Sequence, residues 1–348
     1  MQVPDDVPKS ERTWYLNSMR WLNFVIEELS LLNLERVYPK IFSGQLLSIE
    51  FLPHPSEEGY ELDRLYVGCL LKAGLDAIDI YLWPSLYEVN RHRYDKIVNQ
   101  IRNEDKKLIM GYQVLPKRYK AAGLCVYFDT LFKKPPTFEE FLKIEKAFTE
   151  EYISRYKPDY YLPVVEPITN ELRVGSIFSP LEWKRLLNEC CSIIKDINPE
   201  TKVGAALTSA PSDQLLIDAF LDIKDLDFIG LNIYSHDALG ILYSLARKAR
   251  EKDKSLWISE TWLTNARPHF YEYWRADLDS KWLRAMTYIC RLCRIECLNV
   301  WWTMHFILYE NWSNKDEYVK KMIKALKEGE ETKTLIEFKK IIKEARVN

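Results

Sequence analysis

Hydrophobic and polar positions follow two alternating patterns along most of this chain. Short apolar runs typical of buried strands are followed by longer segments with apolar residues at helical spacing. From Gln45 onward this strand-then-helix unit recurs eight times. The predicted strands are 46–51, 76–82, 107–113, 159–166, 202–207, 226–234, 255–261 and 298–303. The predicted helices are 58–73, 89–104, 137–156, 180–197, 212–221, 237–252 and 271–296, followed by two closing stretches at 315–328 and 333–345.

Continuous alternation of this kind predicts parallel strands joined by right-handed helical crossovers. Eight units fit an α/β fold of the (β/α)8 TIM barrel type. A doubly wound sheet would need a glycine-rich loop after the first strand, and segment 51–59 has one glycine and two prolines. We therefore expect a single domain over 1–348, with the barrel in 45–348.

Residues 1–44 precede the repeating units and form a predicted N-terminal helical extension. Its helix runs from about Ser10, a suitable N-cap, to about Leu34. We expect this helix either to cover the bottom of the barrel or to pack against its outer helices.

Charge and apolar content narrow the possible partners. The 49 Lys and Arg residues are balanced by 51 Asp and Glu residues, so the chain lacks the basic surplus of a general nucleic-acid binder. No apolar run approaches the ~18 residues of a membrane span. The first ten residues lack the pattern of a signal peptide, and we expect a cytoplasmic protein without a membrane partner.

Three of the seven cysteines, Cys290, Cys293 and Cys297, have the spacing of one helical face. Without a nearby fourth ligand they make a poor zinc site, so we interpret them as core residues. His54, His236 and His305 each follow a predicted strand but lack the paired spacing of metal ligands. We expect neither a metal nor another cofactor.

Two predicted strands end on carboxylates, the fourth at Glu166 and the seventh at Glu260. Active sites of such barrels lie at the C-terminal ends of the strands, and strands three steps apart face each other across the mouth. Strict alternation puts Glu260 on the same strand face as Leu256 and Ile258. Two facing carboxyl groups suit glycoside hydrolysis, which needs one protonated and one ionised acid.

Other polar and aromatic residues follow neighbouring strand ends and are candidate substrate contacts. Asn232 and Tyr234 share one face of the sixth strand, and one of Trp301 and Trp302 should point into the barrel as a sugar platform. The remaining candidates are Glu50, His54, Tyr81, Trp83 and His236. Three of these, Glu50, Tyr81 and Trp83, have an equally good structural interpretation. Glu50 fits an ion pair with an arginine, and the alternating Asp79, Tyr81 and Trp83 fit a filled layer of the barrel.

The motifs around both carboxylates resemble a known family. Val164-Val-Glu166-Pro167 and Trp257-Ile-Ser-Glu260-Thr261 are similar to signatures of the clan A glycoside hydrolases, retaining (β/α)8 enzymes that include cellulases, mannanases and galactanases. Segment 227–234 resembles the sixth strand of endo-β-1,4-galactanase-like members, in which a tyrosine hydrogen-bonds the nucleophile.

The resemblance implies a function and a role for each residue. Glu166 would be the general acid/base, and Glu260 would be the nucleophile, held by Tyr234. Trp302 or Trp301 would form the floor of the sugar-binding site. The implied activity is cofactor-free, retaining hydrolysis of β-linked oligosaccharides or polysaccharides.

One departure from the family pattern leaves alternatives open. Many members have asparagine before the acid/base, where this chain has Val165. Asn170-Glu171, five residues later, is an alternative acid/base pair. A barrel that binds glycans without cleaving them and a metal-dependent barrel hydrolase are the alternative functions.

Overall fold

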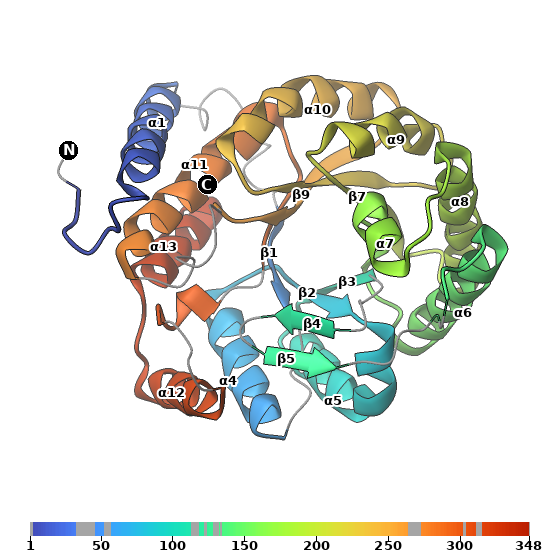
Figure 1. Ribbon diagram of the computed structural model, residues 1–348, viewed down its shortest axis with the longest axis horizontal. Coiled ribbons are helices and arrows are strands. Elements are labelled where there is room, and N and C mark those ends of the chain that lie inside the picture. The colour runs from blue at the N-terminus through green and yellow to red at the C-terminus, as the bar shows by residue number, and fades with distance from the viewer. Residues whose placement is uncertain are drawn as a thin grey trace.

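The computed structural model describes residues 3–32, 46–51, 57–112, 118–121, 124–127, 132, 134–263, 273–301, 304–310 and 315–347. Eight parallel strands close into a barrel in the order β1-β2-β3-β6-β7-β8-β9-β10, with helices around the outside (Figure 1). The predicted (β/α)8 TIM barrel is confirmed.

Each barrel strand lies where an apolar run predicted it. The strands are β1 (Leu46–Phe51), β2 (Ala77–Leu82), β3 (Lys107–Tyr112), β6 (Tyr160–Val165), β7 (Lys202–Thr208), β8 (Phe228–Ile233), β9 (Ser255–Thr261) and β10 (Cys297–Val300). Thus β6 is the fourth barrel strand, β8 the sixth, β9 the seventh and β10 the eighth.

The outer helices also follow the predicted order. They are α4 (Glu57–Ala73), α5 (Pro84–Asn103), α6 (Phe138–Tyr156), α8 (Pro180–Ile197), α9 (Pro211–Leu221), α10 (Leu242–Glu251), α11 (Ala276–Cys293), α12 (Lys315–Glu328) and α13 (Lys333–Val347). Short 3-10 helices lie at His236–Ile241, Tyr273–Arg275 and Met304–Phe306. Thr137 and Ser179 fix the starts of α6 and α8 with reciprocal capping boxes. None of the described helices is long and apolar enough to cross a membrane.

One helix and one hairpin were not predicted from the sequence. Helix α7 (Pro167–Val174) follows β6 directly, and β4 (Arg118–Ala121) pairs with β5 (Leu124–Tyr127) as an antiparallel hairpin between β3 and α6. Both are additions to the connections that leave the C-terminal ends of barrel strands, the side on which active sites of this fold lie.

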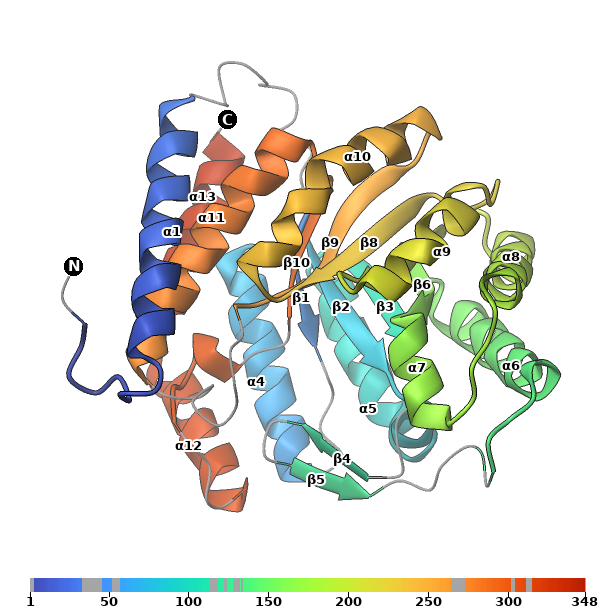
Figure 2. The same cartoon turned by 45° about the horizontal axis from the view of Figure 1, so that its top comes forward.

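The N-terminal helix α1 (Arg12–Leu31) is an outer packing helix, the second of the two predicted possibilities. It lies alongside α11 (Figure 2). The ring of Trp14 lies 6.4 Å from that of Trp274, and the ring of Trp21 lies 6.4 Å from that of Trp282. The indole contacts fix α1 to the barrel wall.

Aromatic rings fill the lower part of the barrel. Trp257 of β9 stacks on Phe228 of β8 at 3.8 Å and meets Tyr160 of β6 at 4.8 Å between ring centroids. A Cβ atom on Gly204 would lie 2.1 Å from the Phe228 ring, so a larger residue there would displace the ring. Because β6 and β9 are not neighbours in the barrel, the Tyr160–Trp257 contact crosses the interior. Trp257 therefore faces inward.

The inward direction of Trp257 corrects the predicted face of β9. Leu256 and Ile258, the residues on either side of Trp257, belong to the opposite face, toward the helices. The prediction that Glu260 lies on the same strand face as Leu256 and Ile258 is therefore wrong.

The cysteine prediction is partly wrong. Cys290 and Cys293 are buried on α11, but the helix ends there, and Cys297 belongs to β10. The Cys297 sulfur lies 3.6 Å from Oγ of Ser48 on β1. Their burial as core residues is confirmed. Among the described residues, no group of three His, Cys, Asp or Glu side chains is placed to hold a metal ion.

Candidate active site

A one-residue irregularity in β9 sets the position of Glu260. Leu231 of β8 pairs with Ile258, but the next residue, Asn232, pairs with Glu260. Ser259 is the extra residue of a β-bulge, which changes the direction of the side chains that follow it. Trp257, Ser259 and Glu260 consequently all face the interior, whereas Thr261 faces outward and accepts a 3.0 Å hydrogen bond from Trp282 of α11.

Glu166 reaches the barrel mouth through an unusual backbone conformation. It follows β6 with φ 50° and ψ 69°, the left-handed region, and is the N-cap of α7. Pro167 follows it and disfavours the ordinary helical region for the preceding residue. For a residue with a Cβ, the left-handed conformation costs roughly 1–2 kcal/mol, and such strain is concentrated at functional sites.

Asn232 connects the two carboxyl groups. Its Nδ2 donates to Glu166 Oε1 at 2.8 Å, and its side chain also hydrogen-bonds Glu260. Its Oδ1 accepts from Ser259 Oγ at 2.7 Å, which fixes the orientation of the amide. Asn232 thus holds the carboxyl groups of strands four and seven close together.

Burial and charge control the ionisation of Glu260. Burial raises its pKa well above the usual range, and the neighbouring charge of Glu166 raises it further. Hydrogen bonds from the Tyr234 hydroxyl and from Asn232 act in the opposite direction, because they stabilise the carboxylate. The net effect is a raised pKa for Glu260, so burial and the charge of Glu166 outweigh the two hydrogen bonds.

A third acid lies deeper in the interior. Asn299 of β10 donates to Asp79 Oδ2 of β2 and to the Ser259 carbonyl, each at 2.7 Å. Ser48 of β1 donates to Asn299 Oδ1, also at 2.7 Å. Burial raises the pKa of Asp79 to about 7, against the lowering effect of its hydrogen bonds with Asn299 and the Gly111 backbone. The polar network therefore extends from Glu166 across the barrel to β2.

Trp301 is the described member of the Trp301–Trp302 pair, and it packs against Tyr234, the residue that hydrogen-bonds Glu260. Its ring lies 6.0 Å from the Tyr234 ring in an edge-to-face arrangement, and its backbone N–H donates to the Thr261 carbonyl at 3.0 Å. Trp302 lies outside the described residues. A half-buried indole beside Tyr234 can serve as a platform for a sugar ring.

The remaining candidates are more dispersed. Tyr81 and Trp83 are 5% and 4% exposed and pack edge to face at 5.9 Å, so they fill a layer of the barrel in this structure. The His236 ring packs against Trp21 of α1 at 5.4 Å. Glu50 lies on β1 opposite Asp79, but its side chain is outside the described part of the chain, as is His54.

Glu171, the alternative acid, is held by hydrogen bonds away from Asn232 and Glu166. Its Oε1 accepts 2.9 Å hydrogen bonds from the Phe178 amide and the Trp183 indole, and the residue is buried. Asn170 donates to the Val165 carbonyl at 2.9 Å. The Trp183 bond anchors α7 to α8, so Glu171 is part of the helix packing, whereas Glu166 is the carboxylate in contact with Asn232.

Sequence reasoning missed Ser48, Ser259 and Asn299 as members of the site. Each is a polar residue inside an otherwise apolar strand, which was the available signal. It also missed Asp213 of α9, whose carboxylate accepts from the Thr208 amide at 2.7 Å. Burial raises the pKa of Asp213, and the charge of Glu166 adds to this effect.

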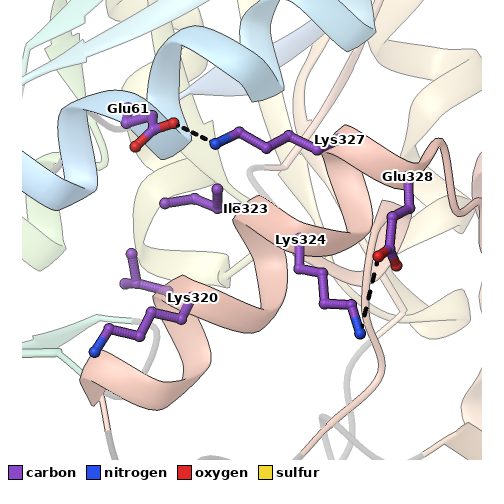
Figure 3. Close-up of a pocket in the computed structure, with 7 residues that line it drawn as sticks. Glu61, Lys320, Ile323, Lys324, Lys327 and Glu328 are labelled. Atoms are coloured by element: carbon purple, nitrogen blue, oxygen red, sulfur yellow. Dashed lines mark ion pairs between the residues drawn. The ribbon is translucent and has the colours of Figure 1, made fainter.

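A separate groove of about 460 Å³ lies outside the barrel between α4 and α12 (Figure 3). Lys327 of α12 forms a 2.8 Å ion pair with Glu61 of α4 across it. The other lining residues are Val319, Lys320, Ile323, Lys324 and Glu328. The groove is built from outer helices and contains none of the residues around Glu166 and Glu260.

Comparison with known proteins finds no matching family and no matching curated protein. Solved structures do match. The barrel has the fold of glycoside hydrolases. An exo-β-1,4-mannosidase from Opitutaceae bacterium strain TAV5 superposes with a TM-score of 0.56 at 13% identity, covering 87% of this chain and 59% of that one. Xylanase 10B from Thermotoga maritima gives 0.52 at 10% identity, covering 88% and 98% of the two chains. A GH113 β-1,4-mannanase gives 0.51 at 11% identity, covering 80% and 98%.

Proposed function

We propose that this chain is a retaining glycoside hydrolase that cleaves β-linked oligosaccharides or polysaccharides. The observation that supports this best is the contact of one amide, Asn232, with both Glu166 and Glu260. The retaining mechanism needs the two carboxyl groups roughly 5–5.5 Å apart, and contact with one shared amide favours this short separation over the roughly 6.5–9.5 Å that inversion requires to admit a water. The fold shared with mannosidases, mannanases and xylanases is consistent with this class.

In the proposed mechanism Glu260 is the nucleophile. Its carboxylate attacks the anomeric carbon and forms a glycosyl ester, while Glu166 donates a proton to the departing glycosidic oxygen. Glu166, now a carboxylate, then removes a proton from a water molecule that attacks the same carbon and breaks the ester. Both acids return to their starting states, and the anomeric configuration is retained.

The hydrogen bonds favour this assignment of roles. Tyr234 and Asn232 both donate to Glu260, and donation stabilises the ionised form. In the proposed cycle Glu260 is ionised when it attacks; burial and the charge of Glu166 oppose this ionised state, and the two hydrogen bonds offset part of that opposition. Trp301, next to Tyr234, would provide the apolar surface for the sugar face.

The test is chemical rescue of Glu260→Ala on a panel of chromogenic β-glycosides. Hydrolysis should fall by several orders of magnitude, and azide should restore release of the chromophore with an α-glycosyl azide as product. Glu166→Ala should instead retain turnover of substrates with activated leaving groups and give a β-glycosyl azide. Glu171→Ala is the matched control and should keep the wild-type reaction. Hydrolysis by Glu260→Ala at the wild-type rate would refute the mechanism.

One observation favours a second function, glycan binding without cleavage. Val165 stands before Glu166, and a Cβ on Gly111 would lie 3.6 Å from its side chain, so this position presents an aliphatic group to the interior. Calorimetric binding of an oligosaccharide, without hydrolysis of any substrate on the panel, would support this function over the enzymatic one.

A further inference from the structure

The barrel interior contains an acid that the two-carboxylate mechanism does not use. Asp79 is 5% exposed, and its described hydrogen-bond partners, the Asn299 amide and the Gly111 backbone, are neutral. A buried carboxyl group without a cationic partner lowers stability when it ionises. Asp79 lies on β2, outside strands four and seven, so its position calls for an explanation.

A continuous series of hydrogen bonds connects Asp79 to the carboxyl pair. The two N–H groups of Asn299 go to Asp79 and to the Ser259 carbonyl, and its Oδ1 accepts from Ser48. Every polar group of the Asn299 side chain therefore has a partner, and Asp79 helps to fix its orientation. The Asn299 amide in turn fixes the peptide of Ser259, the bulge residue that precedes Glu260.

The second half of the series begins at the Ser259 side chain. Its hydroxyl donates to Asn232, and Asn232 contacts both Glu166 and Glu260. Asp79 is thus connected to the pair through Asn299, Ser259 and Asn232. The four hydrogen bonds that lead from Asp79 to Glu166 are each 2.7 or 2.8 Å long.

The titratable groups near Asp79 come from several strands. Glu260 of β9 and Cys297 of β10 both experience its charge. Glu50 lies opposite Asp79 on β1. From β3 the neighbouring group is Gly111, and from β6 the aliphatic Val165 faces Gly111. Of the catalytic pair, Glu260 is the acid on which Asp79 acts directly.

We propose that Asp79 is a positioning residue that controls the ionisation of Glu260, both by its charge and through the Asn299–Ser259 connection to the bulge. The site then contains three interacting carboxyl groups. This inference rests on the proposed function for the role of Glu260 as nucleophile. When Asp79 is ionised, it opposes ionisation of Glu260, so removal of its charge should allow Glu260 to ionise at lower pH.

The test is a carboxyl 13C NMR titration of the full chain, with the Glu260 resonance assigned from Glu260→Gln. Asp79→Asn keeps a hydrogen-bond acceptor for Asn299 and removes the charge. We expect the Glu260 titration midpoint to fall by about one pH unit, a tenfold change in its acid dissociation constant. Asp79→Ala, which also removes the acceptor, should lower the midpoint and additionally alter the Ser259 and Asn299 amide resonances.

Glu145→Gln is the matched control, because Glu145 is also a buried acid but lies on α6 in contact with Tyr112. It should leave the Glu260 midpoint unchanged. An unchanged midpoint in both Asp79 variants would overturn the inference, as would an equal shift in Glu145→Gln. The titration requires no turnover, so its result is independent of whether the chain hydrolyses glycosides. A chain with the expected shift but no hydrolysis would contradict the proposed function alone.

Discussion

Asp79→Asn should make the folded protein more stable at neutral and alkaline pH. The carboxyl group has a pKa of about 7 in the folded chain because it is buried, compared with 3.8 for an exposed aspartate. The difference of about 3 units corresponds to a penalty of about 4 kcal/mol for the ionised form at pH 7 and above. Asparagine does not carry this penalty, although the hydrogen bond with Asn299 loses about 1 kcal/mol of charge reinforcement. We expect a net gain of about 3 kcal/mol at pH 8.

The stability difference between Asp79→Asn and the natural chain should depend on pH. The folded state binds the Asp79 proton more tightly than the unfolded state does, so the stability of the natural chain falls as pH rises from about 4 to about 7. Asp79→Asn removes this contribution. Its stability relative to the natural chain should therefore rise by about 1.4 kcal/mol per pH unit within that window and level off above it.

Urea unfolding followed by tryptophan fluorescence at pH 5, 6, 7 and 8 measures the difference. Glu88→Gln, which changes an exposed carboxyl group on α5, is the control and should change stability by less than about 0.5 kcal/mol. If Asp79→Asn is less stable than the natural chain at pH 8, or if the difference is the same at every pH, the reasoning about burial of Asp79 is wrong.

Three further substitutions test separate parts of the structure. Tyr234→Phe removes a donor to Glu260, so kcat/KM should fall by about 30-fold, equivalent to about 2 kcal/mol, and the acidic limb of the pH profile should move to higher pH. An unmoved profile would contradict the role of this hydroxyl. Glu171→Gln weakens two buried hydrogen bonds, so thermal unfolding should show a loss of about 1–3 kcal/mol while kcat stays within about twofold. A folded but inactive variant would restore Glu171 as a candidate acid. Asp279→Ala removes the buried carboxylate that pairs with Arg275 at 3.4 Å and should cost about 3–5 kcal/mol in urea unfolding. Unchanged stability would show that this ion pair is not required.

The barrel could be predicted from the sequence because all eight strands are apolar runs between helical segments. The direction of individual side chains could not. Alternation predicts a face correctly only along a regular strand, and the bulge at Ser259 changes the pairing of β9 with β8. Nothing in the residues 255–261 indicates which position is the extra one, because a bulge depends on the register with the neighbouring strand.

The acids were easier to find than the residues that hold them. Glu166 and Glu260 stand out at strand ends, and a polar residue in an apolar strand was an available signal for Asn299. The left-handed backbone at Glu166 is a property of the fold that residue type does not reveal. Helix α7 was missed because it begins directly after that residue, without a turn that would separate it from β6.

The bulge in β9 also affects how many functional groups one strand can supply. A regular strand presents a single side chain to each level of a barrel interior, because the next residue points toward the helices. With one additional residue, β9 presents Ser259 and Glu260 in succession, so one strand provides both a group for reaction and a group that binds its neighbours. Transfer of this site to another barrel would therefore require the extra residue as well as the two glutamates, since a regular strand with the same sequence would turn Glu260 toward the helices.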